Sequence, residues 1–539
     1  MRYSFAVAAG LLAAAAYACV PSSFDSLTGG APADAGAQDS APDVNLAAPR
    51  PLAPISVSWV NTLRPELRWS LPLAATGAVV ELCKTRGCEL IEHSYEVRGA
   101  TFVVPDDLTP GMWFWRLRSM AGSSKGLTTS PTWQFLLRGP AAKGSSTVPE
   151  GAIADINGDG IADLQVVNTL GELEVYFGEL DGRFTLASRI QVERGAIDTA
   201  TQVRIASGMD MNGDGYADTI LALGPKEPGD AGTDYPFVPF FGSSTGLKRA
   251  PTAPRVPYSP GMGRSLSGAG DYNGDGYGDF IVGSNGAAYV VFGGTSFGSG
   301  IITTTGFLSE PLSGHFVLGG FDWNGDGFSD AITAVHDRDG HGVRTYGGAV
   351  GLVDLLDSRL DAKPPRALTA AAALDIDGDG RLDLAFSPPF APPCPPLDGK
   401  EVLRCGGICA VKSSDARYDY CVGYVALGPS LVGVSSVMTA VDLDGTGKDT
   451  LLFDTVTKSG DGTQTAVTAF VFPETDLDIE SERVIQASVT YGTQLTTIYP
   501  GRPGKGRWAA TRADGAFGVI IFDGDTPLRT LGTIAAALR

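Results

Sequence analysis

The sequence has few of the residues and motifs that usually carry catalysis. Only four of its 539 residues are histidine. It contains neither the HExxH pattern of zinc hydrolases nor the GxxxxGK[ST] loop that holds phosphates. It also has few long stretches with the apolar period of amphipathic helices. Instead, 71 glycines and many short alternating runs predict an all-β protein and give little support for an enzyme.

The N-terminus has the parts of a secretion signal. Arg2 supplies a positive charge, Phe5–Ala16 form an apolar run, and small residues end at position 18, which predicts a signal peptide over residues 1–18. The run is shorter than the roughly 20 residues of a membrane-spanning helix. Cys19 follows, and this arrangement resembles the lipobox of bacterial lipoproteins, whose cysteine is acylated. The resemblance implies a lipid anchor; an ordinary signal peptide before an incidental cysteine is the alternative.

The anchored chain is expected in the bacterial cell envelope. Val20 stands where some lipoproteins have the Asp that keeps them at the inner membrane, which favours the outer membrane or the cell surface. Residues 19–52 are rich in Ala, Pro, Asp and Ser, so they cannot bury enough apolar surface to offset their ordering entropy. We expect a flexible tether there, followed by at least two domains.

The cysteine count agrees with export to an oxidising compartment. There are seven cysteines, and acylation of Cys19 leaves an even number for disulfides. Cys83 and Cys88 are close enough in sequence to pair locally. A zinc site is a minority alternative because no pair of CxxC motifs is present. The other candidates, whose spacing permits three pairings, are Cys394, Cys405, Cys409 and Cys421.

Residues 53–138 have the pattern of a β-sandwich. Alternation in Pro65–Trp69 and Ala78–Leu82 predicts two core strands. The turn Leu108–Gly111 leads into the aromatic run Trp113–Arg118, and Trp133–Phe135 closes the segment. This resembles a fibronectin type III domain, although other immunoglobulin-like sandwiches share the pattern. The resemblance implies a spacer or binding domain without catalytic chemistry.

An acidic repeat organises residues 143–539. The nine-residue pattern D-x-[DN]-G-D-G-x-x-D occurs five times, and an eroded sixth copy begins at Asp442. We call these segments loops 1 to 6 and number their residues 1 to 9. Positions 1, 3, 5 and 9 are the predicted metal ligands, namely Asp155, Asn157, Asp159, Asp163; Asp210, Asn212, Asp214, Asp218; Asp271, Asn273, Asp275, Asp279; Asp322, Asn324, Asp326, Asp330; Asp375, Asp377, Asp379, Asp383; and, as a weak site, Asp442 and Asp444.

Alternate acidic side chains in a tight loop suit calcium, which prefers several hard oxygen ligands. Glycine at position 6 permits the positive φ angle that folds the chain around an ion. An EF-hand is excluded because the flanks lack a helical pattern and because position 12 has no Glu. In loop 6, Thr446 and Thr450 replace two carboxylates, so we expect weak binding or none. The residues found at position 12 are Val166, Leu221, Val282, Thr333 and Phe386.

Each intact loop runs into an apolar strand, and a second strand then ends in an aromatic-glycine turn such as Val175–Gly178. This order of elements resembles the FG-GAP/VCBS repeats that form the β-propeller of integrin α-subunits. The resemblance implies one four-stranded blade per repeat. Residues 491–539 have strand-like runs without a loop, so we expect them to form a seventh, closing blade; six blades with a separate tail are the alternative. The predicted fold is therefore a fibronectin type III-like sandwich followed by a seven-bladed propeller.

The carboxylates of the loops are nearly equal in number to the net negative charge of the chain. The formal net charge is −20, and the five intact loops carry three carboxylates in four cases and four in the fifth, sixteen in all. Little acidic surface remains for a basic partner, and nucleic acid is a poor candidate. We expect about five calcium ions in a structural role, since calcium outside the cell is often plentiful and such sites are weak. Reversible calcium sensing is the alternative.

Three enlarged connections are expected on the face opposite the loops, because strand alternation places second-to-third connections there. They are the His336–His341 segment, the insertion 388–421 and residues 224–235. Rigid scaffolds often carry recognition residues on such loops. The candidate contacts are His336, Asp337, Asp339 and His341.

We therefore expect a monomeric, non-enzymatic protein that binds a protein or glycan through this face. Its only contact with the membrane would be the lipid anchor. The alternatives for the enlarged connections are plain hairpin turns or a transition metal held by two histidines. The alternative function is that of a polysaccharide hydrolase or lyase using Asp and His on the same face.

Overall fold

A computed structural model gives the fold of the chain. Within the described residues, every regular element is a β-strand, and no helix is long and apolar enough to cross a membrane. The predicted all-β class is confirmed, whereas the signal peptide, Cys19 and most of the tether lie outside these residues. The described residues are 45–138, 151–192, 201–225, 237–251, 256, 261–284, 287–297, 304–306, 316–323, 325, 327–337, 340–347, 370–387, 407–413, 418–423, 431–443, 445–459, 462–470, 482–483, 491–498, 506–512, 519–523, 526–531 and 535–538.

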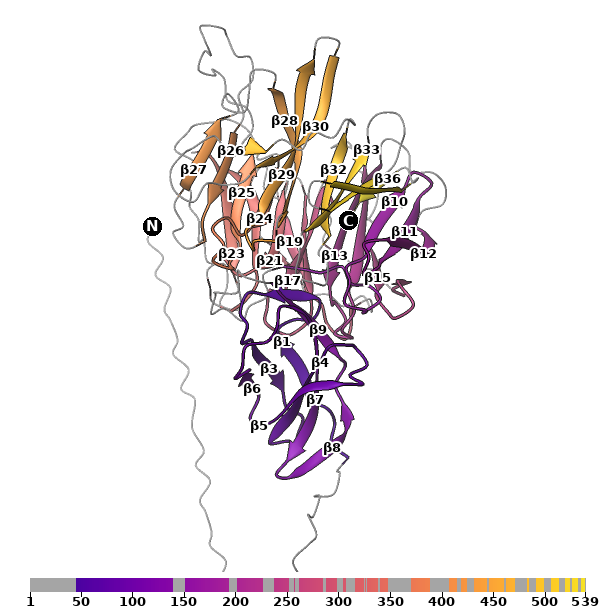
Figure 1. Ribbon diagram of the computed structural model, residues 1–539, viewed down its shortest axis with the longest axis vertical. Coiled ribbons are helices and arrows are strands. Elements are labelled where there is room, and N and C mark those ends of the chain that lie inside the picture. Colours follow the sequence, from indigo (N-terminus) through magenta and orange to yellow (C-terminus); the bar gives the residue numbers. More distant parts are fainter. Residues whose placement is uncertain are drawn as a thin grey trace, which may run out of the picture. The chain divides into compact units, whose positions relative to one another are not determined.

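Two sheets form an N-terminal sandwich over residues 45–138 (Figure 1). One has the strand order β1-β3-β6, and the other has the order β2-β9-β7-β4-β5 with β8 paired to β7. Strands β2 and β9 run parallel. The first strand begins within the segment predicted as a tether. The strands are β1 (Arg50–Ala53), β2 (Ser58–Val60), β3 (Glu66–Ser70), β4 (Gly77–Cys83), β5 (Ile91–Arg98), β6 (Thr101–Val103), β7 (Gly111–Ala121), β8 (Ser124–Thr129) and β9 (Trp133–Leu137).

Tryptophans fill the core between these two sheets. Trp69 of β3 lies in the same buried cluster as Trp115 of β7 and Trp133 of β9. The rings of Trp115 and Trp133 meet edge to face with centroids 6.0 Å apart, a favoured aromatic geometry. The predicted local disulfide is also confirmed, since Cys83 at the end of β4 is bonded to Cys88.

Seven further sheets follow. Each is built from consecutive antiparallel strands, except that the first also contains the C-terminal strand of the chain. Six are described with four strands and one with three. Their strands are β10 (Leu164–Asn168), β11 (Glu172–Gly178), β12 (Phe184–Gln191); β13 (Thr201–Met209), β14 (Asp218–Pro225), β15 (Phe237–Phe241), β16 (Lys248–Arg249); β17 (Ser265–Gly270), β18 (Asp279–Gly283), β19 (Ala288–Val291), β20 (Thr304–Gly306); β21 (Val317–Phe321), β22 (Asp330–Asp337), β23 (Gly340–Gly347); β24 (Ala370–Leu374), β25 (Asp383–Ser387), β26 (Gly407–Val411), β27 (Tyr418–Gly423); β28 (Leu431–Val441), β29 (Thr450–Ser459), β30 (Gly462–Phe470), β31 (Glu482–Arg483); β32 (Tyr491–Ile498), β33 (Arg507–Arg512), β34 (Val519–Asp523), β35 (Thr526–Leu531); and β36 (Ala535–Leu538).

The C-terminal strand belongs to the first of these seven sheets. β36 pairs with β10 in the order β12-β11-β10-β36, with Val166 opposite Leu538 and Val167 opposite Ala537. The predicted final segment, residues 491–539, is therefore divided. Strands β32 to β35 form a sheet of their own, whereas the last strand completes a sheet that begins more than half a chain earlier.

Neighbouring sheets pack face to face. Val167 of the first sheet and Leu221 of the second lie in one buried cluster, while Ile220, on the other face of the second sheet, lies in a cluster with Phe280 of the third. Strands that are covered on both faces need apolar residues at successive positions. This explains why the apolar run Phe280–Val282 of β18 does not alternate with polar residues.

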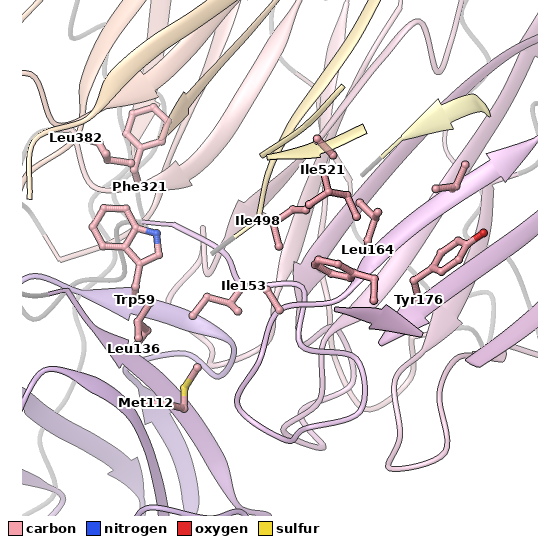
Figure 2. Packing of buried hydrophobic residues seen from close by; sticks show 14 of the residues in the cluster. Trp59, Met112, Leu136, Ile153, Leu164, Tyr176, Phe321, Leu382, Ile498 and Ile521 are labelled. Carbon is pink, nitrogen blue, oxygen red and sulfur yellow. The ribbon is translucent and has the colours of Figure 1, made fainter. Parts of the chain in front are cut away.

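One buried cluster joins the N-terminal sandwich to the seven-sheet region. Trp59 of β2, Met112 of β7 and Leu136 of β9 belong to the same cluster as Phe321 and Leu382. Figure 2 shows the Trp59 ring directed toward these last two residues. The shared apolar contacts bring the β2–β9–β7 face of the sandwich against the residues that surround the Asp-rich loops.

Candidate metal centre

The Asp-rich loops occupy corresponding places in their sheets. Loops 2 to 6 each join the first strand of a sheet to its second, as Asp210–Asp218 joins β13 to β14. Loop 1 leads into β10, whose inner neighbour is β36. In loops 2 to 5, the aspartate at position 9 is also the first residue of the following strand. The loops therefore lie at the same end of each sheet.

The carboxylate at position 1 fixes the turn of each described loop. In loop 1, Asp155 Oδ1 accepts hydrogen bonds from Gly158 N (2.7 Å) and Asp159 N (3.1 Å), and Asp155 Oδ2 accepts one from Gly160 N (2.7 Å). Gly158 and Gly160 have φ angles of 74° and 88°, which side chains disfavour. Glycine is therefore needed at position 4 as well as at the predicted position 6.

The carboxylate at position 9 connects the loop to the aromatic-glycine turn. In loop 2, Asp218 Oδ2 accepts a hydrogen bond from Met211 N, and Asp218 Oδ1 accepts one from Gly242 N, both at 2.8 Å. The same pair of bonds is present in loops 1 and 3. In the fifth sheet, Ser413 N takes the place of the glycine N–H and donates to Asp383 Oδ1 at 2.8 Å. One side chain thus connects the start of the loop with the turn at the end of the second strand after the loop.

This contact also explains why the turn contains glycine. A Cβ atom on Gly242 would lie 2.3 Å from the carbonyl oxygen of Ala217, and one on Gly178 would lie 2.3 Å from that of Ala162. Real Cβ atoms do not come so close to a backbone oxygen. The sequence revealed the recurring turn. It did not reveal that the backbone oxygen at position 8 of the acidic loop leaves room only for glycine in that turn.

Most of the carboxylates at positions 1 and 9 are almost completely buried, with Asp271 and Asp442 half-buried. Asp155, Asp210 and Asp218 are 0% exposed. Burial and the neighbouring carboxylate of Asp214 raise the pKa of Asp210 to about 8, and burial raises the pKa of Asp271 to about 7. Burial and Asp210 raise the pKa of Asp218 well above its usual range. Such a group of buried carboxylates is stabilised by a bound cation.

The ligand set of loop 5 fits a hard divalent cation. In loop 5, carboxylate oxygens of Asp375, Asp377 and Asp383 lie within 4.8 Å of one another, and two of these residues are buried. Oxygen ligands from an acidic loop are the donors that calcium, magnesium and manganese prefer. In loop 4, Asp322 and Asp330 are placed, but Asn324 and Asp326 lie outside the described residues, as does Asp444 of loop 6.

Backbone hydrogen bonds connect successive loops, a feature that the sequence did not reveal. The N–H at position 8 donates to the position 1 carbonyl of the preceding loop, as Ala217 N does to Asp155 O (3.1 Å) and Gly278 N does to Asp210 O (2.7 Å). Asp449 N bonds to Asp375 O in the same way. The last such bond runs from Gly506 N to Asp442 O (2.6 Å), although Gly506 follows no acidic loop.

The N-terminal sandwich contacts the loops directly, which was also not predicted. Gln134 Nε2 donates to the Asp155 carboxylate at 2.8 Å, and Ser56 Oγ donates to Gly215 O at 2.9 Å. Arg86 donates to Gly158 O (3.0 Å) and Gly215 O (2.6 Å), bridging loops 1 and 2. Asn61 donates to a carbonyl oxygen of loop 5. The loop ends of these sheets are therefore in contact with the sandwich.

The predicted recognition residues are only partly described. His336 and His341 lie opposite each other on β22 and β23, and Asp337 lies opposite Gly340, while Asp339 is outside the described residues. Their register places the two histidines opposite each other near the end of a hairpin. The expected enlarged connection is wrong here, because only residues 338 and 339 join β22 to β23. The segment 224–235 lies largely outside the described residues.

The cysteine-rich insertion is shorter than expected. The predicted span of 388–421 is wrong, because β26 and β27 occupy its second half, and the connection between β25 and β26 is limited to residues 388–406. Cys409 and Cys421 are register partners on these two strands. Cys394 and Cys405 lie outside the described residues.

Two segments match the GxSxG pattern of serine hydrolases, Gly242–Gly246 and Gly294–Gly298. That pattern supports catalysis when a strand leads through a sharp turn into a helix. Here the central serine of the first segment, Ser244, lies in a turn between strands β15 and β16 and not between a strand and a helix. The geometry of a nucleophile elbow is therefore not present in this turn.

Without metal, the protein should become less stable as the pH rises. The position 1 carboxylates have raised pKa values in the folded state, about 7 for Asp271 and Asp375. The folded chain therefore holds more protons than the unfolded chain between about pH 4 and pH 7, and stability is lost as the pH rises through this window. We expect a lower melting temperature at pH 8 than at pH 5.5 in excess chelator, measured by calorimetry. With saturating metal the difference should shrink or reverse, and a pH-independent metal-free melting temperature would contradict this account.

Gly242→Ala should destabilise the protein because the new methyl group would collide with the carbonyl of Ala217. We expect a loss of about 2 kcal/mol or more, in the range of overpacking mutations, together with weaker metal binding to loop 2. Gly126→Ala is a suitable control, since its Cβ would have contacts no shorter than 3.4 Å. Equal unfolding free energies for the two variants in urea titrations would show that the glycine is not required.

Comparison with known proteins assigns one segment of the chain to a known type of repeat. A family profile described as an FG-GAP-like repeat matches residues 155–221, which contain loops 1 and 2. No curated protein matches the sequence. A solved lectin from Agrocybe aegerita, whose title describes recognition of non-reducing terminal N-acetylglucosamine, is 13% identical with a TM-score of 0.35, covering 70% of this chain and 91% of its own. A protein from Lactobacillus plantarum is 10% identical with a TM-score of 0.16, covering 86% and 99%. Neither similarity bears on function, and the predicted FG-GAP repeat is confirmed for residues 155–221.

Proposed function

We propose that this chain is a calcium-stabilised surface lipoprotein that binds a protein or a glycan and catalyses no reaction. The proposal includes a seven-bladed β-propeller formed by the seven C-terminal sheets. The observation that carries it is the repeated unit in which a buried position 9 carboxylate joins an acidic loop to an aromatic-glycine turn. Such a unit builds a rigid scaffold and supplies no catalytic group.

The contacts of the inner strands support a ring of seven blades. The strands β13, β17, β21, β24, β28 and β32 contact one another in that order, and β36 contacts both β32 and β13. Residues of these inner strands line one cavity of about 190 Å³ together with Trp59 of the sandwich. A C-terminal strand that completes the first sheet is a common way to close such a ring, since full closure leaves no exposed edge strand.

The chemistry of the loops supports calcium as the bound ion. The ligands are carboxylate and amide oxygens without Cys or His, and calcium tolerates irregular oxygen shells better than magnesium does. The buried carboxylates at positions 1 and 9 would repel each other without a cation, so occupancy contributes directly to folding. We therefore propose about five structural calcium ions, one in each intact loop.

The sheet order supports the proposed fibronectin type III-like fold of the N-terminal sandwich. Three strands lie in one sheet and the longer β7, β4 and β5 lie in the other, with tryptophans buried between the sheets. This division is typical of immunoglobulin-like sandwiches. Because its β2–β9–β7 face contacts the loops, we propose that this domain stabilises the propeller and leaves ligand binding to other surfaces.

The ends of the sheets opposite the loops remain as the proposed recognition surface. The β22–β23 hairpin carries His336 and His341 in direct register, and the connection 388–406 follows β25 in the next sheet. Both are second-to-third connections, so both lie at the end opposite the loops. A hairpin and a long connection in adjacent sheets of a rigid scaffold can form a specific binding surface.

The lipid anchor can be tested through its cysteine. We expect wild-type protein to partition into the detergent phase of Triton X-114 extracts, because an acyl chain adds a large apolar group. Cys19→Ser should move the protein to the aqueous phase, whereas Ser22→Ala should behave as wild type. A Cys19→Ser protein that stays in the detergent phase would show that the anchor lies elsewhere.

The recognition surface can be tested with glycan and protein arrays probed by the full chain in calcium. For any ligand found, we expect His336→Ala/His341→Ala, or replacement of residues 388–406 by a short Gly-Ser linker, to weaken binding about tenfold or more. Leu73→Ala is the control, since Leu73 is 97% exposed on the sandwich. Unchanged binding in both recognition variants would contradict the proposed surface. Turnover of a polysaccharide that is lost in Asp337→Asn or His341→Ala would instead favour a hydrolase or lyase.

A further inference from the structure

Loop 6 keeps the shape of a metal loop although its ligand set is incomplete. Asp442 Oδ1 accepts hydrogen bonds from Gly445 N (2.8 Å) and Thr446 N (3.1 Å), and its Oδ2 accepts one from Gly447 N (2.8 Å). These bonds match those of the intact loops. Thr446 and Thr450, however, stand where the intact loops have carboxylates. The loop is folded even though it lacks two of the ligands that a calcium ion would use.

Position 8 of loop 6 differs from the other loops in charge. The intact loops have Ala162, Ala217, Gly278, Ser329 and Leu382 at this position, all uncharged, whereas loop 6 has Asp449. The Asp449 side chain is only 1% exposed. Asp449 Oδ2 accepts a hydrogen bond from Asp375 N at 2.9 Å, so it contacts the backbone of loop 5 as well. A carboxylate buried here needs a positive partner.

Arg138, the last described residue of the sandwich, supplies that partner. Its Nη2 and Nη1 atoms donate to Asp449 Oδ1 (2.7 Å) and Oδ2 (3.2 Å) in a bidentate pair. The Arg138 side chain is 8% exposed, and its guanidinium lies 4.6 Å from the centre of the Trp59 ring. The cation is therefore held from both sides by the sandwich and by loop 6.

Two other arginines of the sandwich reach intact loops but bind them differently. Arg86 donates to the backbone oxygens Gly158 O and Gly215 O, and Arg50 donates to the backbone oxygen of Asp275. In these contacts neither guanidinium donates to a loop carboxylate, so the carboxylates remain for a metal ion. Among these three arginines, only Arg138 binds a carboxylate, and it does so at the loop whose ligand set is broken.

We propose that Arg138 is the built-in cation of loop 6, where its guanidinium takes the role that calcium has in the intact loops. The pair with Asp449 then fixes the sandwich to the seven-sheet region at a point that does not depend on metal. This inference rests on the proposed calcium binding of loops 1 to 5. A chelator would empty those loops, but it would leave the Arg138–Asp449 contact in place.

The substitution Arg138→Met tests the proposal, because methionine retains much of the side-chain volume without the charge. Breaking one partner of a buried ion pair is strongly destabilising, so we expect the melting temperature to fall by about 3 °C or more in calcium and in chelator alike. Thermolysin should also separate the sandwich from the seven-sheet region more rapidly. Arg183→Met is the matched control, since Arg183 is 67% exposed in its ion pairs. Arg138→Lys, which keeps the charge but loses the bidentate geometry, should lie between wild type and Arg138→Met.

A rescue variant tests the exchange of cation for metal. Arg138→Met combined with Thr446→Asp, Asp449→Ala and Thr450→Asp gives loop 6 the acidic ligands and the small position 8 residue of an intact loop. We expect this variant to bind one more calcium ion than the wild type in isothermal titration, and to regain stability in calcium but not in chelator. If Arg138→Met cannot be purified folded, this variant and Arg138→Lys still decide the question.

The possible outcomes separate the inference from the proposed function. An Arg138→Met protein as stable and as resistant to thermolysin as Arg183→Met would overturn the role of Arg138 alone. A wild-type chain that binds calcium in loop 6 would also overturn it. Absence of any bound calcium, with a melting temperature unchanged by chelator, would overturn the proposed function and with it the exchange of guanidinium for metal.

Discussion

The buried carboxylate at position 9 is the interaction on which the architecture of each repeat depends. Asp218 accepts hydrogen bonds from Met211 N at the start of its loop and from Gly242 N in the turn beyond β15. A single desolvated side chain therefore sets the distance between the loop and two strands. Because a buried carboxylate is costly without compensation, the same residue that organises the sheet also creates the need for a cation. The need for a cation and the shape of the sheet are thus two consequences of one buried charge.

Local features of the fold could be predicted from the sequence because their cause lies within a few residues. The spacing of Asp and Gly in each loop dictates its turn, the apolar run after it dictates a strand, and the separation of Cys83 from Cys88 permits a local disulfide. The pairing of β36 with β10 could not be predicted in the same way. Ala535–Leu538 has the composition of an ordinary strand, and nothing in its four residues specifies a partner near Val166. Contacts between distant segments depend on how the complete set of sheets packs.

The contact between the sandwich and the loops could have been predicted in part from the alternation of residues along β7. In β7, Trp113 and Trp115 lie in the core of the sandwich, while Met112 and Phe114 lie in the cluster that includes residues of the seven-sheet region. A strand of a two-sheet sandwich with one solvent-exposed face should have polar residues at these alternate positions. Large apolar residues on both faces therefore indicated a second covering surface, although not which part of the chain provides it.

The same loops are stabilised from two directions, and this restricts where a ligand can bind. From inside the loop, buried carboxylates require a cation; from outside, the sandwich satisfies backbone carbonyls through Ser56 and Arg86 and covers apolar residues with Trp59. Since the sandwich covers the carbonyls that accept such bonds, an external ligand would have to displace the sandwich before it could reach them. Displacement would also expose the tightly packed Arg138–Asp449 pair and the apolar cluster around Trp59. The energetic cost of that exposure is a further argument for the proposed recognition surface at the opposite ends of the sheets, where a ligand would bind without disturbing the contacts that hold the sheets in place.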